Sequence, residues 1–338
     1  MAPRPHVPDE LRDRPFRGTE AVKRGLLTKR QLHGSAWPRL FRDIYVWRGL
    51  PLTGIVRAQA VELLTPPTGV VTGRCAAWLM GVDILRREDS RLEVTIGREQ
   101  HLRPDPALRI RRALIPDEDL ETIQGVLFTN LPRTAFDLCR RRRPRSRYEL
   151  TEAVVALDAL VHWSRVDADA LDALAQRQGP YLRTLDGPAR SLLLAAPGAL
   201  IRPGALDLDE FQAYALSHRG WRGVRLVPEV VGLCEPAAES PMESRLRMLL
   251  ALNGFPKPEV QFPVRVDGAT YRIDLAYPDE MLAIEYDGAS HRDRWPEDLR
   301  RQNQLEDLGW QFRRYTSDTY YNTPNQILTQ IGRALRRS

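Results

Sequence analysis

Two short alternating segments near the C-terminus place the strongest constraint on how this chain can fold. Residues 270–277 and 282–287 alternate apolar with polar side chains, and Pro278-Asp279-Glu280 between them is typical of a tight turn. Side chains two apart in a strand share a face of the sheet. The pattern therefore predicts a β-hairpin whose apolar face packs against a core.

Three carboxylates occupy polar positions of this predicted hairpin. Asp274, Glu285 and Asp287 are expected to share the face opposite the apolar side chains. Carboxylates gathered in this way repel one another unless a cation lies among them, and their oxygen atoms suit Mg²⁺ or Mn²⁺. Such an ion can activate water and stabilise charge on a phosphate. The hairpin thus predicts a metal site, and an acidic surface without function is the alternative.

The residues of the hairpin also resemble a known family. The series Ile273-Asp-Leu, followed by Ile284-Glu-Tyr-Asp-Gly-Ala-Ser-His291, resembles the core of the PD-(D/E)XK nucleases, in particular the DUF559 branch related to very-short-patch-repair endonucleases. The resemblance covers residues 237–338 and implies metal-dependent hydrolysis of DNA. The superfamily often has a lysine two residues after the second acid, where this chain has Asp287. His291 is then the nearest candidate for a base, an acid or a phosphate contact.

A predicted helix opens this C-terminal module. Ser240-Pro241-Met242-Glu243 fits a capping box, with Ser at the N-cap, Pro at the first helical position and Glu at the third. Glu243 also matches the helix-borne acid that the family places near its metal. Gln261 begins the next strand and is a candidate contact for the same site. The expected element order is α-β-β-β-α-β-α around a small mixed sheet.

Arginines of the last elements are candidate phosphate contacts, with ordinary surface charge as the alternative. They are Arg300, Arg301, Arg313 and Arg314, of which Arg313 is the nucleic-acid-binding candidate. The module itself, residues 237–338, holds 14 basic and 15 acidic side chains. Steering of a polyanion toward it therefore needs local patches or another part of the chain.

Residues 1–54 hold 11 basic and 5 acidic side chains, an excess that equals the net charge of +6 for the whole chain. Thr19 and Thr28 are candidate N-caps of two short helices separated by Gly25, and residues 37–47 predict a bent hairpin. This arrangement is winged-helix-like and indicates binding of DNA or of a partner protein. A small solvated helical cap is the alternative. The candidate nucleic-acid contacts of the module are Lys23, Arg24, Lys29, Arg30, Arg39 and Arg42.

Residues 18–145 resemble the N-terminal part of AbiE-type antitoxins. The segments that carry this resemblance are Gly25-Leu-Leu-Thr-Lys-Arg-Gln-Leu, Leu40-Phe-Arg-Asp-Ile-Tyr, Val71-Thr-Gly-Arg-Cys-Ala-Ala-Trp-Leu-Met-Gly and Leu131-Pro-Arg-Thr-Ala-Phe-Asp-Leu. Asp43 stands where the resemblance leads us to expect glycine. The resemblance implies a role in a toxin–antitoxin or regulatory system.

The fold class expected for the chain is α/β, in an α+β multidomain arrangement. The expected domains are a winged-helix-like module at 1–54, a small α/β domain at 55–147, a helical region at 148–236 and a restriction-endonuclease-like domain at 237–338. Strands are expected at 91–96 and 108–114 and helices at 51–64 and 76–80, with another beginning at Thr134.

Composition narrows the functional classes. The three cysteines are widely spaced, which predicts neither a disulfide framework nor a zinc site. No apolar run reaches the length of a membrane span, so a cytoplasmic protein without membrane contact is expected. The first interpretation is a Mg²⁺- or Mn²⁺-dependent DNA endonuclease. The alternatives are a DNA-binding regulator or antitoxin-like protein with an inactive nuclease fold, and RNA cleavage by the same site.

Overall fold

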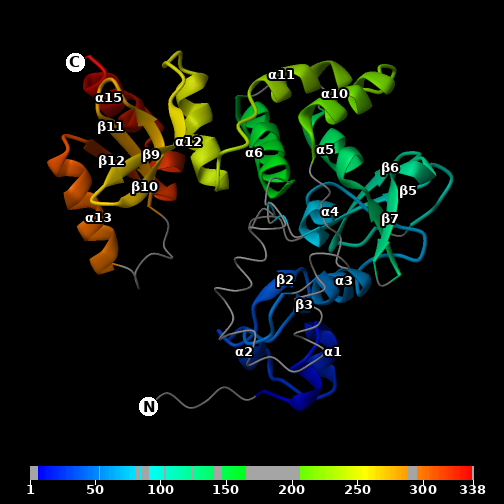
Figure 1. The fold of residues 1–338 in the computed structure, drawn as a ribbon. Coiled ribbons are helices and arrows are strands. Elements are labelled where there is room, and N and C mark those ends of the chain that lie inside the picture. The colour runs from blue at the N-terminus through cyan, green and yellow to red at the C-terminus, as the bar shows by residue number, and fades with distance from the viewer. Residues whose placement is uncertain are drawn as a thin grey trace. The chain divides into compact units, whose positions relative to one another are not determined.

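The strands of the chain form sheets of three, five and four strands within the residues that the computed structural model describes (Figure 1). Those residues are 7–52, 54–80, 82, 84, 91–102, 104–123, 125–140, 147–164, 206–287 and 295–336. The chain divides into two units, Met1–Leu138 with Trp163–Arg219, and Cys139–His162 with Gly220–Ser338. Helices and mixed sheets occur together, so the α/β fold class is confirmed.

The first unit begins with the three-stranded sheet, whose order is β1-β3-β2. After the short helix η1 (Asp9–Leu11), its elements are β1 (Phe16–Arg17), α1 (Gly18–Lys23), α2 (Lys29–Leu32), β2 (Arg39–Phe41) and β3 (Ile44–Tyr45). The two short helices and the hairpin expected near the N-terminus are therefore confirmed. Strand β1, which pairs antiparallel with β3, was not predicted, because two residues carry no periodic signal.

Asp43, at the turn of this hairpin, caps helix α1 from outside the helix. Its carboxylate accepts hydrogen bonds from the Thr19 backbone N–H at 2.8 Å and from the Thr19 hydroxyl at 2.6 Å. The prediction that Thr19 is the N-cap of α1 is thus wrong, since α1 begins at Gly18 and its N-cap is Arg17, two residues earlier. Asp43 has a φ of 64°, a region that glycine enters more easily. The cap bonds explain why Asp43 can stand where glycine was expected. Thr28, by contrast, forms the expected cap of α2, in a capping box with Gln31.

A five-stranded mixed sheet of order β6-β5-β4-β8-β7 follows in the first unit. Its strands are β4 (Val70–Val71), β5 (Leu92–Ile96), β6 (Leu108–Arg112), β7 (Leu120–Ile123) and β8 (Val126–Thr129), with η2 (Asp117–Asp119) before β7. Its helices are α3 (Gly54–Glu62), α4 (Gly73–Leu79), α5 (Leu131–Cys139) and α10 (Leu208–Ser217). Strands β5 and β6 match the prediction. Strands β4, β7 and β8 were missed because they are short and have weak alternation.

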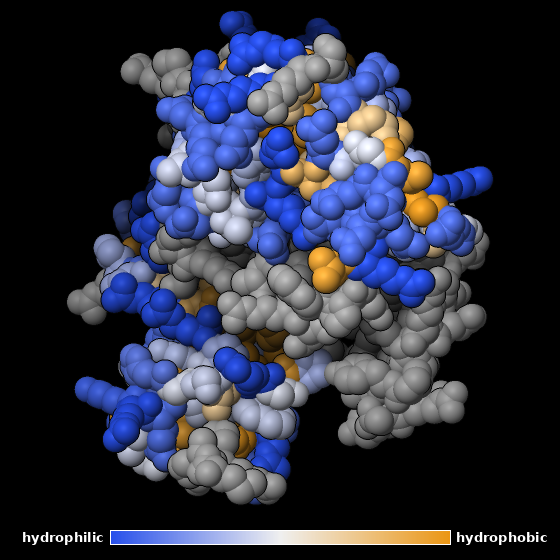
Figure 2. Space-filling model, turned by 90° about the vertical axis from the view of Figure 1, so that its left-hand side faces the viewer, coloured by the Kyte–Doolittle hydropathy of each residue, from blue (hydrophilic) through white to orange (hydrophobic). Residues whose placement is uncertain are grey.

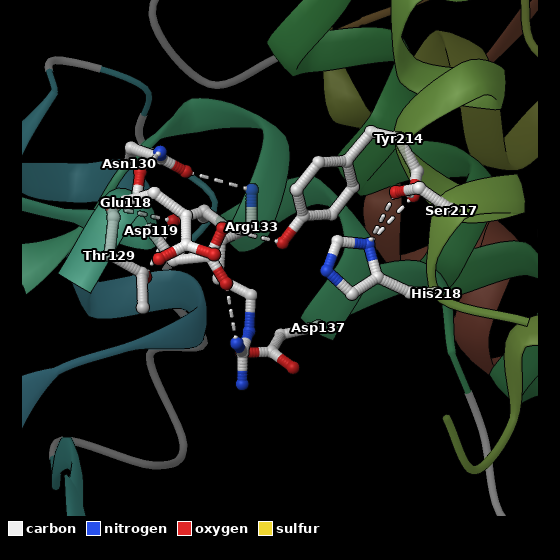
Figure 3. Close-up of polar contacts among 10 residues, drawn as sticks. Glu118, Asp119, Thr129, Asn130, Arg133, Asp137, Tyr214, Ser217 and His218 are labelled. Carbon is white, nitrogen blue, oxygen red and sulfur yellow. Dashed lines mark hydrogen bonds and ion pairs between the residues drawn. The ribbon is translucent and has the colours of Figure 1, made fainter. Parts of the chain in front are cut away.

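A buried ion-pair network ties α5 and α10 to the turn before β7 (Figure 3). The Arg133 side chain is 2% exposed, and its guanidinium contacts Asp119 at 2.8 Å and Asp137 at 3.1 Å. The hydroxyl of Tyr214 on α10 donates to the second Asp119 oxygen at 2.8 Å. Burial acts to lower the pKa of Arg133, but the two carboxylates outweigh it and raise that pKa. The network therefore stays charged and joins segments far apart in the sequence.

We expect Arg133→Met to lower the free energy of unfolding of this unit by about 3–5 kcal/mol, because it leaves two buried carboxylates without their cation. Arg109→Met is the matched control, since Arg109 pairs with Glu93 at 3.4 Å and is 38% exposed. That control should cost less than about 1 kcal/mol. Urea unfolding measures both. Equal losses in the two variants would show that the Arg133 network contributes no more than a surface ion pair.

The second unit contains the four-stranded sheet, whose order is β12-β11-β10-β9. Strands β9 (Glu259–Val266), β10 (Ala269–Tyr277) and β11 (Leu282–Tyr286) run antiparallel in sequence, as the hairpin prediction required. Strand β12 (Gln311–Tyr315) is parallel to β11. Helix α13 (Trp295–Asp307) lies in the connection between them, as parallel neighbours require.

Both faces of this sheet are covered (Figure 1). Leu275 and Ile284 pack in one apolar cluster with residues of α12 (Pro241–Ala251) and α15 (Pro324–Ala334). Ala276 and Ala283, on the other face, pack with Leu305 of α13. The expected order of elements is confirmed, with one addition, the short helix α14 (Ser317–Asn322) before α15.

Helix α6 (Arg147–Ser164) packs against α12 through buried charges and belongs to the second unit. Asp158 accepts hydrogen bonds from the Arg247 guanidinium at 2.8 Å and the Ser244 hydroxyl at 2.6 Å. Glu152 accepts from Arg245 at 2.8 Å. These contacts fix α12 from the side opposite the sheet. The connection to α12 includes η3 (Val224–Leu226) and α11 (Val227–Gly232).

The helical character expected for residues 148–236 is present in α6, α10 and α11, and residues 165–205 lie outside the described part. Among the described helices, none has the length and apolar content that a bilayer crossing needs.

Candidate functional site

The regular alternation of the C-terminal sheet is interrupted at Asp274. The β9–β10 register places Gln261 opposite Asp274, but no ladder pair forms there, although the flanking residues pair on both sides. Ile273 packs in the apolar cluster under α13, whereas Leu275, two residues later, packs in the cluster under α12 and α15. Gln261 has a φ of 53°. The chain thus leaves the standard pleat at the Gln261–Asp274 position, which redirects the Asp274 side chain.

The two central strands also separate at this point. Strands β10 and β11 pair from Tyr277–Leu282 to Leu275–Ile284, and no further pair is formed in the described strands. Beyond it, an Asp274 carboxylate oxygen accepts the Tyr286 backbone N–H at 3.0 Å. The side chain of Asp274 therefore replaces a backbone acceptor of the ladder and lies between the diverging strands.

Glu243 reaches this place from the first turn of α12. The Ser240 hydroxyl accepts the Glu243 backbone N–H at 3.2 Å, so the predicted N-cap is confirmed. The Glu243 carboxylate, however, accepts from the Glu239 backbone at 3.0 Å and from the Gln261 amide at 2.9 Å. The expected reciprocal bond of a capping box to Ser240 is replaced by these contacts. Glu243 is buried and is linked through Gln261 to the strand opposite Asp274.

Glu285 is held by two arginines. It is 6% exposed, and its carboxylate receives Arg301 of α13 at 2.7 Å on one oxygen and Arg314 of β12 at 3.1 Å on the other. Arg314 stands in register with Glu285 in the parallel β11–β12 pair. Arg301 also donates to the Arg272 backbone carbonyl on β10 and so spans the gap between β10 and β11.

Glu285 lies on the polar face that the alternation predicted, but this face is covered and Glu285 is buried. A parallel pair needs a crossover connection, and the α13 helix of that connection packs on the face where Glu285 lies. Alternation along β11 identified the face of this carboxylate correctly. It contained no information on what covers the face.

The electrostatics of the site are dominated by Asp274. Burial and the nearby Glu243 and Glu285 carboxylates raise the pKa of Asp274 to about 7, against the opposing effects of the Tyr286 hydrogen bond and of Arg301. Glu285 has two cations beside it, whereas Asp274 has carboxylates on either side. Burial and the neighbouring carboxylates therefore outweigh Arg301, the cation that acts on Asp274.

The remaining predicted residues of this module lie apart from these three acids or outside the described chain. Asp287 is exposed, and its backbone N–H extends the β11–β12 pairing by donating to the Tyr315 carbonyl at 2.9 Å. Arg313 is half-buried on the side of β12 opposite Arg314, and its guanidinium bonds the Phe312 carbonyl at 2.8 Å. Gly288 and His291 lie outside the described residues.

The six basic residues singled out near the N-terminus are all exposed. They lie on α1, on α2, beside these helices and in the β2–β3 hairpin, and they are Lys23, Arg24, Lys29, Arg30, Arg39 and Arg42. Arg24 forms an ion pair with Glu10. Helix α2 has 4 residues.

Sequence reasoning did not identify Arg301 and Arg314 as the partners of Glu285. A usable signal was present for Arg314, because in the expected order α-β-β-β-α-β-α the last two strands flank one helix. Such a connection predicts parallel neighbours, although the register that pairs Arg314 with Glu285 requires the structure.

Comparison with known proteins supports a nuclease-like C-terminal domain. Residues 256–335 match the model of the REase_MTES_1575 family, which is restriction-endonuclease-like. The match includes Asp274 and Glu285 but begins after Glu243. The chain is also 30% identical over 180 residues to "Uncharacterized protein MT2308" and "Uncharacterized protein Rv2248" from two strains of Mycobacterium tuberculosis, CDC 1551 and ATCC 25618. That alignment covers 52% of this chain and 60% of each relative.

The raised pKa of Asp274 leads to a prediction about stability and pH. A carboxyl whose folded-state pKa is raised binds more protons in the folded state, so its ionisation lowers stability as the pH rises from about 4 to about 7. Asp274→Asn removes this loss and can still accept the Tyr286 hydrogen bond. Without metal ions, the variant should match the parent near pH 4 and exceed it in stability above pH 7. The gain should grow by at most about 1.4 kcal/mol per pH unit within this window.

Thermal unfolding of both proteins in EDTA across this pH range measures the effect. Asp287→Asn is the control, because Asp287 is exposed and its substitution should give no such trend. A variant–parent difference for Asp274→Asn that does not change with pH would contradict the prediction.

Proposed function

We propose that the C-terminal unit is a metal-dependent endonuclease that hydrolyses phosphodiester bonds in DNA. The observation that carries this proposal is the meeting of Glu243, Asp274 and Glu285 at the point where β10 and β11 separate, within a restriction-endonuclease-like module. A structural role alone does not account for Glu243 beside Asp274 at a break in the sheet, because neither has an ion pair within the described residues and their mutual repulsion is costly.

The donor set fits Mg²⁺ or Mn²⁺ best at Asp274 and Glu243. Both supply hard oxygen ligands, and a cation would offset the repulsion that raises the pKa of Asp274. Both oxygens of Glu285 already accept from an arginine, which makes Glu285 a weaker candidate ligand, and Asp287 is exposed. In the described part of the chain, no group of three or more His, Cys, Asp or Glu side chains is arranged to hold a metal ion. The sequence-based ligand set of Asp274, Glu285 and Asp287 remains a hypothesis, and we favour Glu243 over Asp287 as a ligand.

The neighbouring groups would orient these ligands. The Gln261 amide holds one Glu243 oxygen, and the Tyr286 backbone N–H holds one Asp274 oxygen, so each carboxylate has a second oxygen directed elsewhere. A bound ion would supply charge stabilisation on the phosphate and activation of the attacking water. His291 remains the nearest candidate for proton transfer.

We expect Asp274→Asn to abolish DNA cleavage in Mg²⁺ or Mn²⁺ while the fold is retained, because the neutral amide is a weak substitute for a charged ligand. In addition, Mg²⁺ or Mn²⁺ should raise the melting temperature of the parent protein but not that of the variant. The assay compares plasmid, single-stranded DNA and single-stranded RNA, each with metal and with EDTA. The control is Arg333→Gln on α15, which should behave as the parent does.

No cleavage of any substrate by the parent, together with no thermal shift on metal addition, would reject the enzyme proposal. A second candidate would then stand, a non-enzymatic DNA-binding regulator or antitoxin-like protein that keeps the nuclease fold as a scaffold. Two observations favour it: two arginines neutralise Glu285 without any metal ion, and Asp287 stands at the usual lysine position.

The N-terminal module is proposed to supply much of the affinity for DNA, or to bind a partner protein. Replacing Lys29, Arg30 and Arg39 together by glutamine should weaken DNA binding and reduce the slope of log K against log [salt] by up to about 0.9 per lost phosphate contact. Fluorescence anisotropy at several salt concentrations provides both numbers. Unchanged affinity and slope would assign this surface to a protein partner or to no partner.

A further inference from the structure

Two guanidinium groups from separate elements converge on one carboxylate at the candidate site. Arg301 comes from α13 and Arg314 from β12, and they bind opposite oxygens of Glu285. The buried carboxylate balances one of the two positive charges, so the trio carries a net charge of +1. Positive charge in excess of what the buried acid needs indicates a further anionic partner.

The outer sides of both arginines remain accessible. The side chains are 25% exposed for Arg301 and 35% exposed for Arg314, whereas that of Glu285 is 9% exposed. Arg301 uses one terminal nitrogen for both of its contacts, and Arg314 uses Nε and Nη2. Within the described part of the chain, neither Nη1 group has an acceptor. Figure 2 shows that the side of the molecule that carries α13 is predominantly hydrophilic.

The position of the pair relative to Asp274 matters for its use. Arg301 is close enough to Asp274 to oppose the rise of the pKa of Asp274, and it spans β10 and β11 through the Arg272 carbonyl. The pair is therefore at the edge of the acidic group and not remote from it. Arginine forks match the oxygens of a phosphate in pairs of hydrogen bonds, and burial of their anchor fixes their orientation in advance.

We propose that Arg301 and Arg314, oriented by Glu285, form a binding site for a backbone phosphate of nucleic acid at the candidate catalytic group. The pair supplies, from α13 and β12, the positive charge that a lysine at position 287 would otherwise supply from β11. Glu285 is then first a positioning residue for the two arginines. This inference rests on the proposed nuclease function for the identity of the ligand.

If Glu285 orients the two arginines, its substitution should affect the binding of nucleic acid in a way that substitution of a simple metal ligand would not. In the free protein, Glu285 competes with an incoming phosphate for the same two guanidinium groups. Removal of its charge should therefore strengthen the binding of nucleic acid in the absence of metal, by more than removal of another nearby negative charge. Asp274→Asn provides that comparison at pH 8.5, above the pKa of about 7 of Asp274, where it removes one negative charge from the same site.

The experiment uses the full-length protein and a short fluorescein-labelled DNA duplex in EDTA, with affinity measured by fluorescence anisotropy. Arg301→Gln and Arg314→Gln should each weaken binding about tenfold, the loss expected for one charge-assisted contact. Glu285→Gln should tighten binding several-fold more than Asp274→Asn does, and Glu285→Gln combined with Arg314→Gln should lose that gain. Arg333→Gln, an exposed arginine on α15, is the matched control and should change affinity less than twofold.

Circular dichroism and melting curves verify the fold of each variant. If an arginine variant does not fold, the comparison of Glu285→Gln with Asp274→Asn still decides the question. Equal effects of these two acid substitutions, or equal effects of Arg314→Gln and Arg333→Gln, would overturn the proposal. Because these measurements involve neither metal nor cleavage, the arginine pair can be upheld while the endonuclease proposal fails, and the reverse outcome is equally visible.

Discussion

A buried carboxylate needs a compensating cation or several hydrogen bonds. In the second unit, Asp158 and Glu285 have such partners, whereas Asp274 has fewer. Asp158 meets it with Arg247 and Ser244, which fixes α6 against α12. Glu285 meets it with two arginines. Asp274 has one backbone hydrogen bond and faces other carboxylates, so its pKa rises to about 7. Of these three carboxylates, Asp274 is the one that has no ion pair within the described residues.

The sequence predicted this module well where its signals were local or periodic. The β10–β11 hairpin, the Ser240 cap and the closing helix each follow from alternation, capping chemistry or an apolar stripe. The break at Asp274 could not be predicted, because it consists of a switch of faces on two strands at once. Before and after such a switch, apolar and polar residues still alternate along each strand, so the sequence does not show where the faces exchange. In the first unit, β1 and β4 have two residues each, too few for any periodic signal.

Sequence analysis predicted the acidic residues of the candidate site, but it missed that Arg301 and Arg314 pair with Glu285. Glu243, Asp274 and Glu285 could be named because each lies at a recognisable position of a helix start or strand. The ion pairs of Glu285 depend on the register of β12 and on the rotation of α13, which are set by tertiary packing and not by local sequence. For the same reason, the sequence did not show that α13 covers the face on which Glu285 lies.

The absence of a lysine at position 287 has a different meaning once the cations are placed. What a phosphate site requires is positive charge at a given point, and the chain can deliver it from any element that reaches that point. A lysine on β11 would have a long flexible stem and a single ammonium group. Arg301 and Arg314 instead come from α13 and β12 and are fixed by a shared carboxylate, which limits their motion before any ligand arrives. The presence of Asp287 in place of the expected lysine therefore removes a basic residue next to β11, but the positive charge of Arg301 and Arg314 remains at the site.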